Sequence, residues 1–116
     1  MLVRLVGRIN GRYSTADFTP IHYLNNKNLS LEEVCALYMA ADAGILTPLR
    51  DGMNVTCHEY VVCQKGNYGP LILSEFAGSA QSLGGAVLVN PWDIRGVAST
   101  MAEVFSMSDT DKYALF

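Results

Sequence analysis

The sequence predicts an α/β fold in which helices flank an open parallel β-sheet. Short apolar runs of strand length alternate with longer segments of helical spacing, which is the pattern of parallel βαβ units. Half of the 116 residues are hydrophobic and only 16% are charged, well below the roughly 25% of an average soluble domain. Ample core material with few charges to cover it leads us to expect one part of a larger domain.

The first third of the chain predicts a helix, a short strand and a second helix. Residues 1–9 carry apolar side chains at helical spacing, and Gly11 is expected to end that helix. Residues 20–24 have the composition of a short strand. Ser30 opens the capping box S-L-E-E, the strongest local helix-start signal in the sequence. An apolar stripe continues this second helix to about Ala41.

The rest of the chain predicts alternating strands and helices. Its three strand-length runs are apolar throughout, as expected of strands covered on both faces. A helix is predicted over residues 53–64, a short helix after a glycine-rich turn, and a last helix opened by Pro91, Trp92 and Asp93. Four strands are expected in all, and the three apolar ones are 43–47, 70–74 and 86–90.

Charge and cysteine content exclude several classes of protein. The net charge of −3 and the pI of about 5.2 leave no basic surface for nucleic acid or an anionic membrane. Three cysteines without a C-x-x-C pair fit neither a disulfide framework nor a zinc site. No apolar run approaches the roughly 18 residues of a membrane span, and Arg4 and Arg8 interrupt any signal-peptide core. We expect a soluble cytoplasmic protein without a bound metal.

In an open α/β sheet, ligands bind beyond the carboxyl ends of the strands. At this edge the segment T-P-L-R-D-G-M-N runs from a strand directly into a predicted helix start. Outward backbone amides of Gly52, Met53 and Asn54 would form a site for phosphate there. The alternative is that Asp51 is only the N-cap of the helix, and the residues alone favour this alternative. The segments expected at this edge are 47–54, 74–79 and 90–93.

Other polar residues give weaker signals. Glu59 lies two helical turns beyond Gly52, where it is placed to accept hydrogen bonds from sugar hydroxyls, although a solvated helix carboxylate is commoner. His58 beside it is expected to face solvent. Gly78 and Ser79 start a short helix that a phosphate is able to approach. The sequence carries neither a dinucleotide fingerprint nor a P-loop.

Three stretches, in order, resemble the C-terminal half of the trehalose-6-phosphate synthases, glycosyltransferase family 20. They are G-R-I-N-G-R-Y to P-I-H-Y-L-N, A-L-Y-M-A to T-P-L-R-D-G-M-N and E-Y, and L-S-E-F-A-G to L-V-N-P-W-D. The resemblance implies a GT-B fold of two Rossmann-like domains, with residues 1–116 a fragment of the nucleotide-sugar-binding C-terminal domain. It also implies retaining, metal-independent transfer of glucose from UDP-glucose to glucose 6-phosphate, which gives trehalose 6-phosphate and UDP.

The same resemblance implies residue roles. Asp51 bonds the donor glucose hydroxyls, Glu59 the ribose hydroxyls, and the backbone at Leu29 lies against the uracil. The acceptor-binding N-terminal domain and the basic pair that grips the diphosphate precede these motifs in the family, so glucose 6-phosphate is expected to bind only with that absent domain. These roles favour an anion site over a simple N-cap. Four consecutive residues hold sugar and diphosphate through their backbone: Gly52, Met53, Asn54 and Val55.

One stretch departs from the family pattern. Where the family usually reads Leu-Val-Ala-Lys-Glu-Tyr, residues 55–60 read V-T-C-H-E-Y. This sequence more closely resembles that of synthase-like regulatory subunits, or that of the synthase-like part of synthase/phosphatase chains. Two functions therefore stay open: the donor-binding part of an active synthase, and a non-catalytic subunit of a complex of trehalose synthase and phosphatase subunits. A truncated product that never accumulates alone is a third reading.

Overall fold

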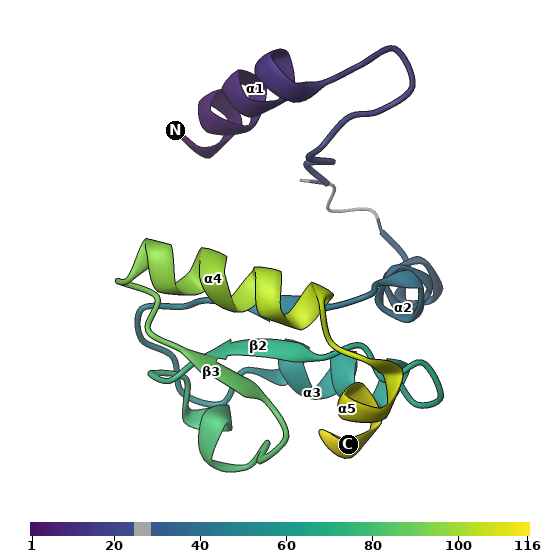
Figure 1. The fold of residues 1–116 in the computed structure, drawn as a ribbon, viewed down its shortest axis with the longest axis vertical. Helices are drawn as coiled ribbons and strands as arrows, with labels where there is room; N and C mark the ends of the chain where they lie inside the picture. Colours follow the sequence, from purple (N-terminus) through teal and green to yellow (C-terminus); the bar gives the residue numbers. More distant parts are fainter. Residues whose placement is uncertain (25–28) are drawn as a thin grey trace.

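The computed structural model describes residues 1–24 and 29–116 (Figure 1). Within them, three parallel strands form one sheet in the order β1-β2-β3, so sheet order follows chain order. Ile45 lies opposite Ile72, and Leu73 lies opposite Leu88. Each strand is reached from the previous one by a crossover, as the alternating pattern predicts, and the result is a partial Rossmann-like domain. The strands are β1 (Gly44–Leu46), β2 (Leu71–Ser74) and β3 (Val87–Val89).

Helices cover the two faces of this sheet. α2 (Leu31–Ala40) and α3 (Val55–Cys63) pack against each other, and α3 lies on one face of β2. α4 (Ile94–Phe105) lies along the other face, above the sheet in Figure 1. The remaining helices are α1 (Leu2–Tyr13), the short 3₁₀ helix η1 (Gly78–Gln81) and α5 (Asp109–Ala114).

The core consists of two apolar clusters that share β2. Leu71 and Leu73 point to the α3 side, where they pack with Cys57 and Tyr60. Ile72 points to the α4 side, where it packs with residues that include Val89 and Val104. Because successive side chains of a strand alternate between faces, one strand supplies both clusters.

The prediction that the apolar strands are covered on both faces is confirmed only for the central one. All four residues of β2 are buried, whereas Ile45 of β1 is 45% exposed and Leu88 of β3 is 49% exposed. Both helix layers cover β2, one on each face, whereas each outer strand of the described sheet has one face that is not fully covered.

Two predictions near the N-terminus are wrong. α1 continues past Gly11 to Tyr13, because a single glycine weakens a helix without ending it. The strand expected over residues 20–24 is absent from the described part of the chain. The backbone of Ile21 is satisfied in another way: its N–H donates to Asn10 Oδ1 at 2.9 Å, and its carbonyl accepts from Asn10 Nδ2 at 2.8 Å. No residue of α1 is buried, and α1 lies apart from the sheet in Figure 1.

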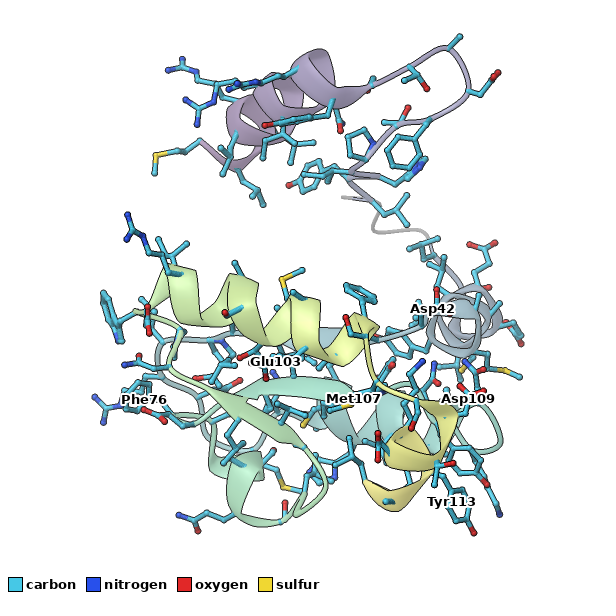
Figure 2. The ribbon with its side chains drawn as sticks, in the orientation of Figure 1. Asp42, Phe76, Glu103, Met107, Asp109 and Tyr113 are labelled. Atoms are coloured by element: carbon cyan, nitrogen blue, oxygen red, sulfur yellow. The ribbon has the colours of Figure 1, made fainter. Side chains whose placement is uncertain are left out.

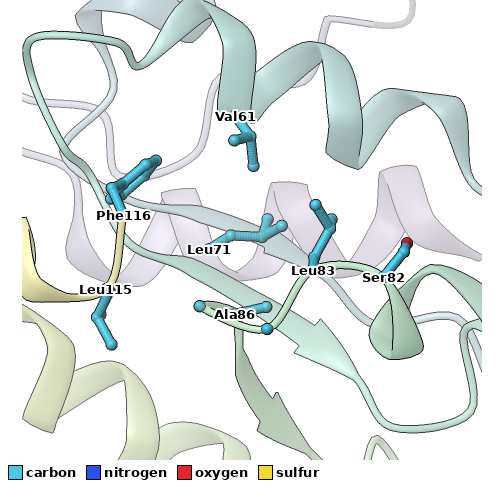
Figure 3. A pocket seen from close by; sticks show the side chains of 9 residues that line it. Val61, Leu71, Ser82, Leu83, Ala86, Leu115 and Phe116 are labelled. Atoms are coloured by element: carbon cyan, nitrogen blue, oxygen red, sulfur yellow. The ribbon is translucent and has the colours of Figure 1, made fainter.

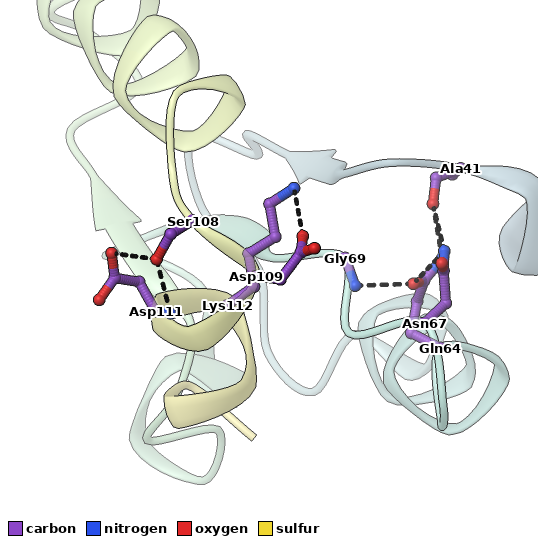
Figure 4. Close-up of polar contacts among 8 residues, drawn as sticks. All are labelled: Ala41, Gln64, Asn67, Gly69, Ser108, Asp109, Asp111 and Lys112. Atoms are coloured by element: carbon purple, nitrogen blue, oxygen red, sulfur yellow. Dashed lines mark hydrogen bonds and ion pairs between the residues drawn. The ribbon is translucent and has the colours of Figure 1, made fainter.

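Side-chain caps set the starts of the later helices. The capping-box prediction is confirmed, since Ser30 Oγ accepts the N–H of Glu33 at 3.2 Å at the start of α2. α4 starts after Asp93, whose carboxylate accepts the N–H of Gly96 at 3.1 Å. α5 is missing from the sequence prediction, although Ser108 caps it and bonds Asp111 at 2.7 Å (Figure 4).

The two ends of the sheet carry different side chains. Figure 2 shows Phe76 at one end, and Asp109 and Tyr113 at the other. Tyr113 packs edge to face on Tyr68 with ring centroids 5.0 Å apart. Phe76 follows the carboxyl end of β2 and is 44% exposed. Across the described residues, every helix is too short or too polar to cross a lipid bilayer.

Candidate functional site

The carboxyl ends of the strands form an edge that we call the carboxyl edge, made of the loops at residues 47–54, 75–79 and 90–93. Its first two loops are joined by a parallel bridge between Asp51 and Ala77. The N–H of Gly78 donates to the Asp51 carbonyl at 3.1 Å, and the N–H of Asp51 donates to the Phe76 carbonyl at 3.5 Å. This backbone pairing fixes the chain on which the predicted site residues lie.

Asp51 lies three residues before the N-cap, so the reading of Asp51 as the helix cap is wrong. The N-cap of α3 is Asn54, whose side-chain oxygen accepts the N–H of Cys57 at 3.3 Å. The other half of the Asn54 amide donates to Asp51 Oδ2 at 2.9 Å. Because Asn54 is the cap, the Asp51 carboxylate is held in place at the carboxyl edge, half-buried, without serving the helix terminus itself.

The predicted row of outward amides is correct in part. The N–H of Asn54 is not free, since it donates to Ser79 Oγ at 3.0 Å. Gly52 and Met53 are exposed, and their N–H groups have no hydrogen-bond acceptor among the residues that the structure describes. Helix α3 starts at Val55, so that residue adds a first-turn amide. Free amides are therefore offered by Gly52, Met53 and the first turn of α3, whereas Asn54 contributes its side chain.

Gly78 and Ser79 have structural roles in place of the predicted phosphate contact. Ser79 is 2% exposed and bonds Asn54, so its hydroxyl faces the neighbouring loop. A Cβ on Gly78 would press on the carbonyl oxygen of Gly52, so only glycine lets the two loops approach this closely. η1 spans only four residues and offers no helix terminus of useful length.

A cavity of about 330 Å³ lies between the facing sides of α2 and α3, beside the place where the two helices pack together. Glu59 lies at this cavity and is exposed, so its carboxylate remains available to a ligand. Leu29 is half-buried just before the cap of α2 and does not line the cavity. The lining residues come from the facing sides of the two helices: Leu31, Val34, Cys35, Tyr38, His58, Glu59, Val62 and Cys63.

His58 does not face solvent, contrary to expectation. It is half-buried and lines the α2–α3 cavity beside Glu59. Its Nε2 atom is buried and has no hydrogen-bond partner among the described residues. Buried polar atoms are nearly always paired, so this nitrogen is an exception among the described side chains.

The hydroxyl of Tyr38 faces an environment that keeps it protonated. Burial raises its pKa, and the nearby charge of Glu59 raises it further. A protonated phenol is both a donor and an acceptor, so Tyr38 adds to the polar capacity of a cavity wall that also contains His58 and Glu59.

A buried amide holds α2 and α3 in this arrangement (Figure 4). Gln64, which follows α3, is fully buried and donates to the carbonyls of Tyr38 and Ala41, the latter at 2.9 Å. Its oxygen accepts the N–H of Gly69 at 2.8 Å and the side chain of Asn67 at 3.1 Å. One side chain thus links the end of α2, the end of α3 and the approach to β2.

A second cavity, of about 190 Å³, lies between α3, β2 and the C-terminal residues (Figure 3). Val61, Leu71, Leu83 and Phe116 are among its apolar lining residues, and no ionisable side chain lines it. This cavity therefore has no side chain suited to acid–base catalysis or to binding a charged ligand. In the part of the chain that the structure describes, no three His, Cys, Asp or Glu side chains gather as metal ligands would.

Comparisons with known proteins agree with this architecture. The profile of glycosyltransferase family 20 matches residues 1–116. Alpha,alpha-trehalose-phosphate synthase (UDP-forming) B of Dictyostelium discoideum is 53% identical over 108 residues, which cover 93% of this chain and 14% of that protein.

Two solved structures have the same fold over 98% of this chain. One is the alpha,alpha-trehalose-phosphate synthase (UDP-forming) of Burkholderia xenovorans in complex with glucose-6-phosphate, with a TM-score of 0.91 and 44% identity. The other is the N-terminal domain of the trehalose-6-phosphate phosphatase of Candida albicans, with a TM-score of 0.91 and 43% identity. This chain spans 25% and 24% of those two chains. Since the profile matches the whole sequence, the chain belongs to glycosyltransferase family 20.

Proposed function

We propose that this chain is the donor-binding part of a glycosyltransferase that moves glucose from UDP-glucose to glucose 6-phosphate, giving trehalose 6-phosphate and UDP. The observation that carries the proposal is the position of Asp51. Its carboxylate is fixed by Asn54 beside the exposed amides of Gly52 and Met53. Residues 1–116 are then a fragment of a nucleotide-sugar-binding C-terminal domain, and the acceptor-binding domain lies outside the chain.

Each residue has a role in this proposal. Asp51 accepts hydrogen bonds from hydroxyls of the donor glucose, and amides from Gly52 to Val55 hold the sugar and the diphosphate, except that Asn54 acts by orienting Asp51. As the bond between glucose and UDP breaks, negative charge grows on the diphosphate. The positive end of helix α3 stabilises that charge. We propose that the transfer needs no metal, because these amides supply the positive field.

The nucleoside end of the donor is assigned to the α2–α3 side. Glu59 accepts hydrogen bonds from the ribose hydroxyls, and the backbone at Leu29 lies against the uracil. Glu59 is exposed at the edge of the α2–α3 cavity, and its carboxylate supports a ligand with hydroxyl donors at this place. We place the protein in the cytoplasm, with subunits of a trehalose synthase/phosphatase complex as further partners.

A second candidate is a non-catalytic synthase-like protein. The similarity to the N-terminal domain of a trehalose-6-phosphate phosphatase supports it, since that domain keeps the same fold in a protein named for another activity. The departure of residues 55–60 from the family's usual wording points the same way. In this candidate the donor site binds UDP without transfer.

Calorimetric titration of the full-length protein with UDP tests the nucleotide assignment. Glu59→Ala is expected to weaken UDP binding by about 1–3 kcal/mol, because hydrogen bonds to a charged group are lost. Glu103→Ala is the matched control, since this carboxylate is exposed on α4, on the other face of the sheet (Figure 2). An unchanged Kd for UDP in Glu59→Ala overturns the role of Glu59.

A transfer assay separates the two candidates. If wild-type protein binds UDP-glucose and makes trehalose 6-phosphate, the enzyme is supported, and Asp51→Asn should then lose transfer while it keeps UDP binding. If wild-type protein binds UDP but transfers no glucose, the non-catalytic candidate replaces the first.

A further inference from the structure

Two of the three cysteines line the α2–α3 cavity, one from each helix. Cys35 lies on α2 and Cys63 is the last residue of α3, and both half-buried thiols line this cavity. The helices that carry them pack directly against each other. Glu59 lies four residues before Cys63, so the two share one face of α3.

The Cys35 thiol influences the pKa of Cys63. The pKa of Cys63 is raised, first by burial and then by the neighbouring Cys35 thiol. The third cysteine has a different environment: Cys57 is fully buried, and its Sγ lies 2.8 Å from the carbonyl oxygen of Asn54. Only Cys35 and Cys63 therefore combine proximity with access to solvent.

We propose that Cys35 and Cys63 form a reversible disulfide that joins α2 to α3 and weakens nucleotide binding at Glu59. The effect on the nucleotide rests on the function proposed above, whereas the formation of the disulfide does not.

The oxidant is a hydroperoxide. One thiolate of the pair attacks a peroxide oxygen, so an S–O bond forms, the O–O bond breaks and the leaving oxygen departs as water after protonation. The sulfenic acid then meets the second thiol: the S–S bond forms, the S–O bond breaks, and a second water leaves. Two thiols and one hydrogen peroxide thus give one disulfide and two waters.

The environment sets the speed of this reaction. Thiolates attack and thiols do not, so the raised pKa of Cys63 keeps that residue slow near neutral pH. The rate of oxidation should therefore rise with pH.

The disulfide would act on the cavity through geometry. A disulfide holds two Cα atoms about 4.4–6.8 Å apart, which ties the facing sides of α2 and α3 together. The disulfide would then fix the separation of the two helices, and with it the width of the cavity at which Glu59 lies.

Peptide mapping of the full-length protein tests the covalent step. The protein is treated with hydrogen peroxide, alkylated after unfolding, digested and analysed by mass spectrometry. We expect a peptide that links Cys35 to Cys63 after peroxide and not in the untreated protein, with Cys57 alkylated and unlinked. Absence of this peptide, or a link through Cys57, overturns the pair.

Titration with UDP before and after peroxide tests the consequence. The Kd of wild-type protein should rise by about tenfold and return after dithiothreitol, within the usual range for coupled sites. In Cys35→Ser and Cys63→Ser, the ratio of the Kd values with and without peroxide should stay near one. An equal change in these variants overturns the proposal.

The outcomes for the disulfide and for the proposed function are distinguishable. If the linked peptide forms and the reduced protein binds UDP with the same Kd as the oxidised one, the regulatory effect is overturned and the donor site stands. If the reduced protein does not bind UDP, the proposed function fails, and the peptide map alone supports or overturns the thiol pair.

Discussion

The side-chain amide of Asn54 donates to Asp51 Oδ2 at 2.9 Å, while its oxygen accepts the N–H of Cys57 at 3.3 Å. One residue therefore both caps α3 and orients the carboxylate that we assign to the donor sugar. The backbone N–H of the same residue donates to Ser79 Oγ. Asn54 is thus the meeting point of the first two loops of the carboxyl edge and the helix that follows.

Asn54→Asp separates the two functions of this side chain. Asparagine and aspartate cap helices about equally well, so stability should change by less than about 0.5 kcal/mol from the cap itself. The donor to Asp51 is lost, however, and two carboxylates meet at hydrogen-bond distance. Since like charges repel, Asp51 should move or take up a proton, and kcat/KM for UDP-glucose should fall by at least about tenfold. Steady-state kinetics and a thermal unfolding curve measure the two effects.

Asn54→Ala is the comparison variant. It loses the cap as well, at a cost of about 1 kcal/mol in stability. If Asn54→Asp keeps the wild-type kcat/KM, the carboxylate of Asp51 does not need its amide partner.

Gln64→Leu should destabilise the protein strongly. The leucine removes the partners of the buried Gly69 N–H and of the Tyr38 carbonyl, at a cost of roughly 1–3 kcal/mol for each unsatisfied group. We expect a total loss of about 2–6 kcal/mol in urea unfolding. Gln81→Leu is the control, since Gln81 is exposed on η1 and the change there should be small. A loss of the same size in both variants contradicts the network.

Gly78→Ala should disturb the site without touching a ligand. The new methyl group presses on the Gly52 carbonyl, which is backbone and yields only if the loop moves. Gly84→Ala makes the same chemical change where no other atom lies within 4 Å of the added carbon. We expect UDP-glucose affinity to fall by about 1–2 kcal/mol in the first variant only, in the range of ordinary packing strain. Equal affinities in the two variants would mean that the loop contact is unimportant for binding.

Tyr60→Phe should alter stability at alkaline pH. The hydroxyl donates to the Gly69 carbonyl at 3.1 Å, and burial, followed by the charge of Asp42, raises the pKa of Tyr60 from 10.0 to about 12. Between these values the unfolded chain loses this proton and the folded protein keeps it. The stability from the protonated hydroxyl is thus complete below pH 10 and is lost as the pH rises towards 12.

The phenylalanine variant lacks this proton in both states. It should be about 1 kcal/mol less stable at pH 7, because a buried hydrogen bond is lost. Its stability should fall less steeply than that of wild type between pH 10 and 12. Parallel curves of unfolding free energy against pH in the two proteins rule out the assignment to Tyr60.

The sequence predicts those parts of the fold that depend on neighbouring residues. Ser30 caps its helix through a bond only three residues long, and β2 is a short apolar run that is buried on both faces. Contacts between residues far apart in the sequence cannot be predicted from local patterns. Local sequence allows Asp51 to be the cap, whereas the backbone at Asn54 is held by a bond to Ser79, which is 25 residues away.

The site follows the same division. Spacing brought the segment at Gly52 and Met53 to the carboxyl edge, while the role of Glu59 rested on resemblance to the family. The burial of His58 depends on α2, which packs on α3 from a different part of the chain. No local pattern carries that information, because a histidine in a helix is buried or solvent-exposed according to which element packs against it.

The bridge between Asp51 and Ala77, with the bond from Asn54 to Ser79, makes the first two loops of the carboxyl edge a single cooperative unit. Neither loop opens to solvent without breaking bonds to the other. Their amide hydrogens should therefore exchange with deuterium in one shared opening event, and a ligand held by the first loop should slow exchange in the second as well. Protection at Gly78, which we do not expect to touch the donor, would then report occupancy at Gly52.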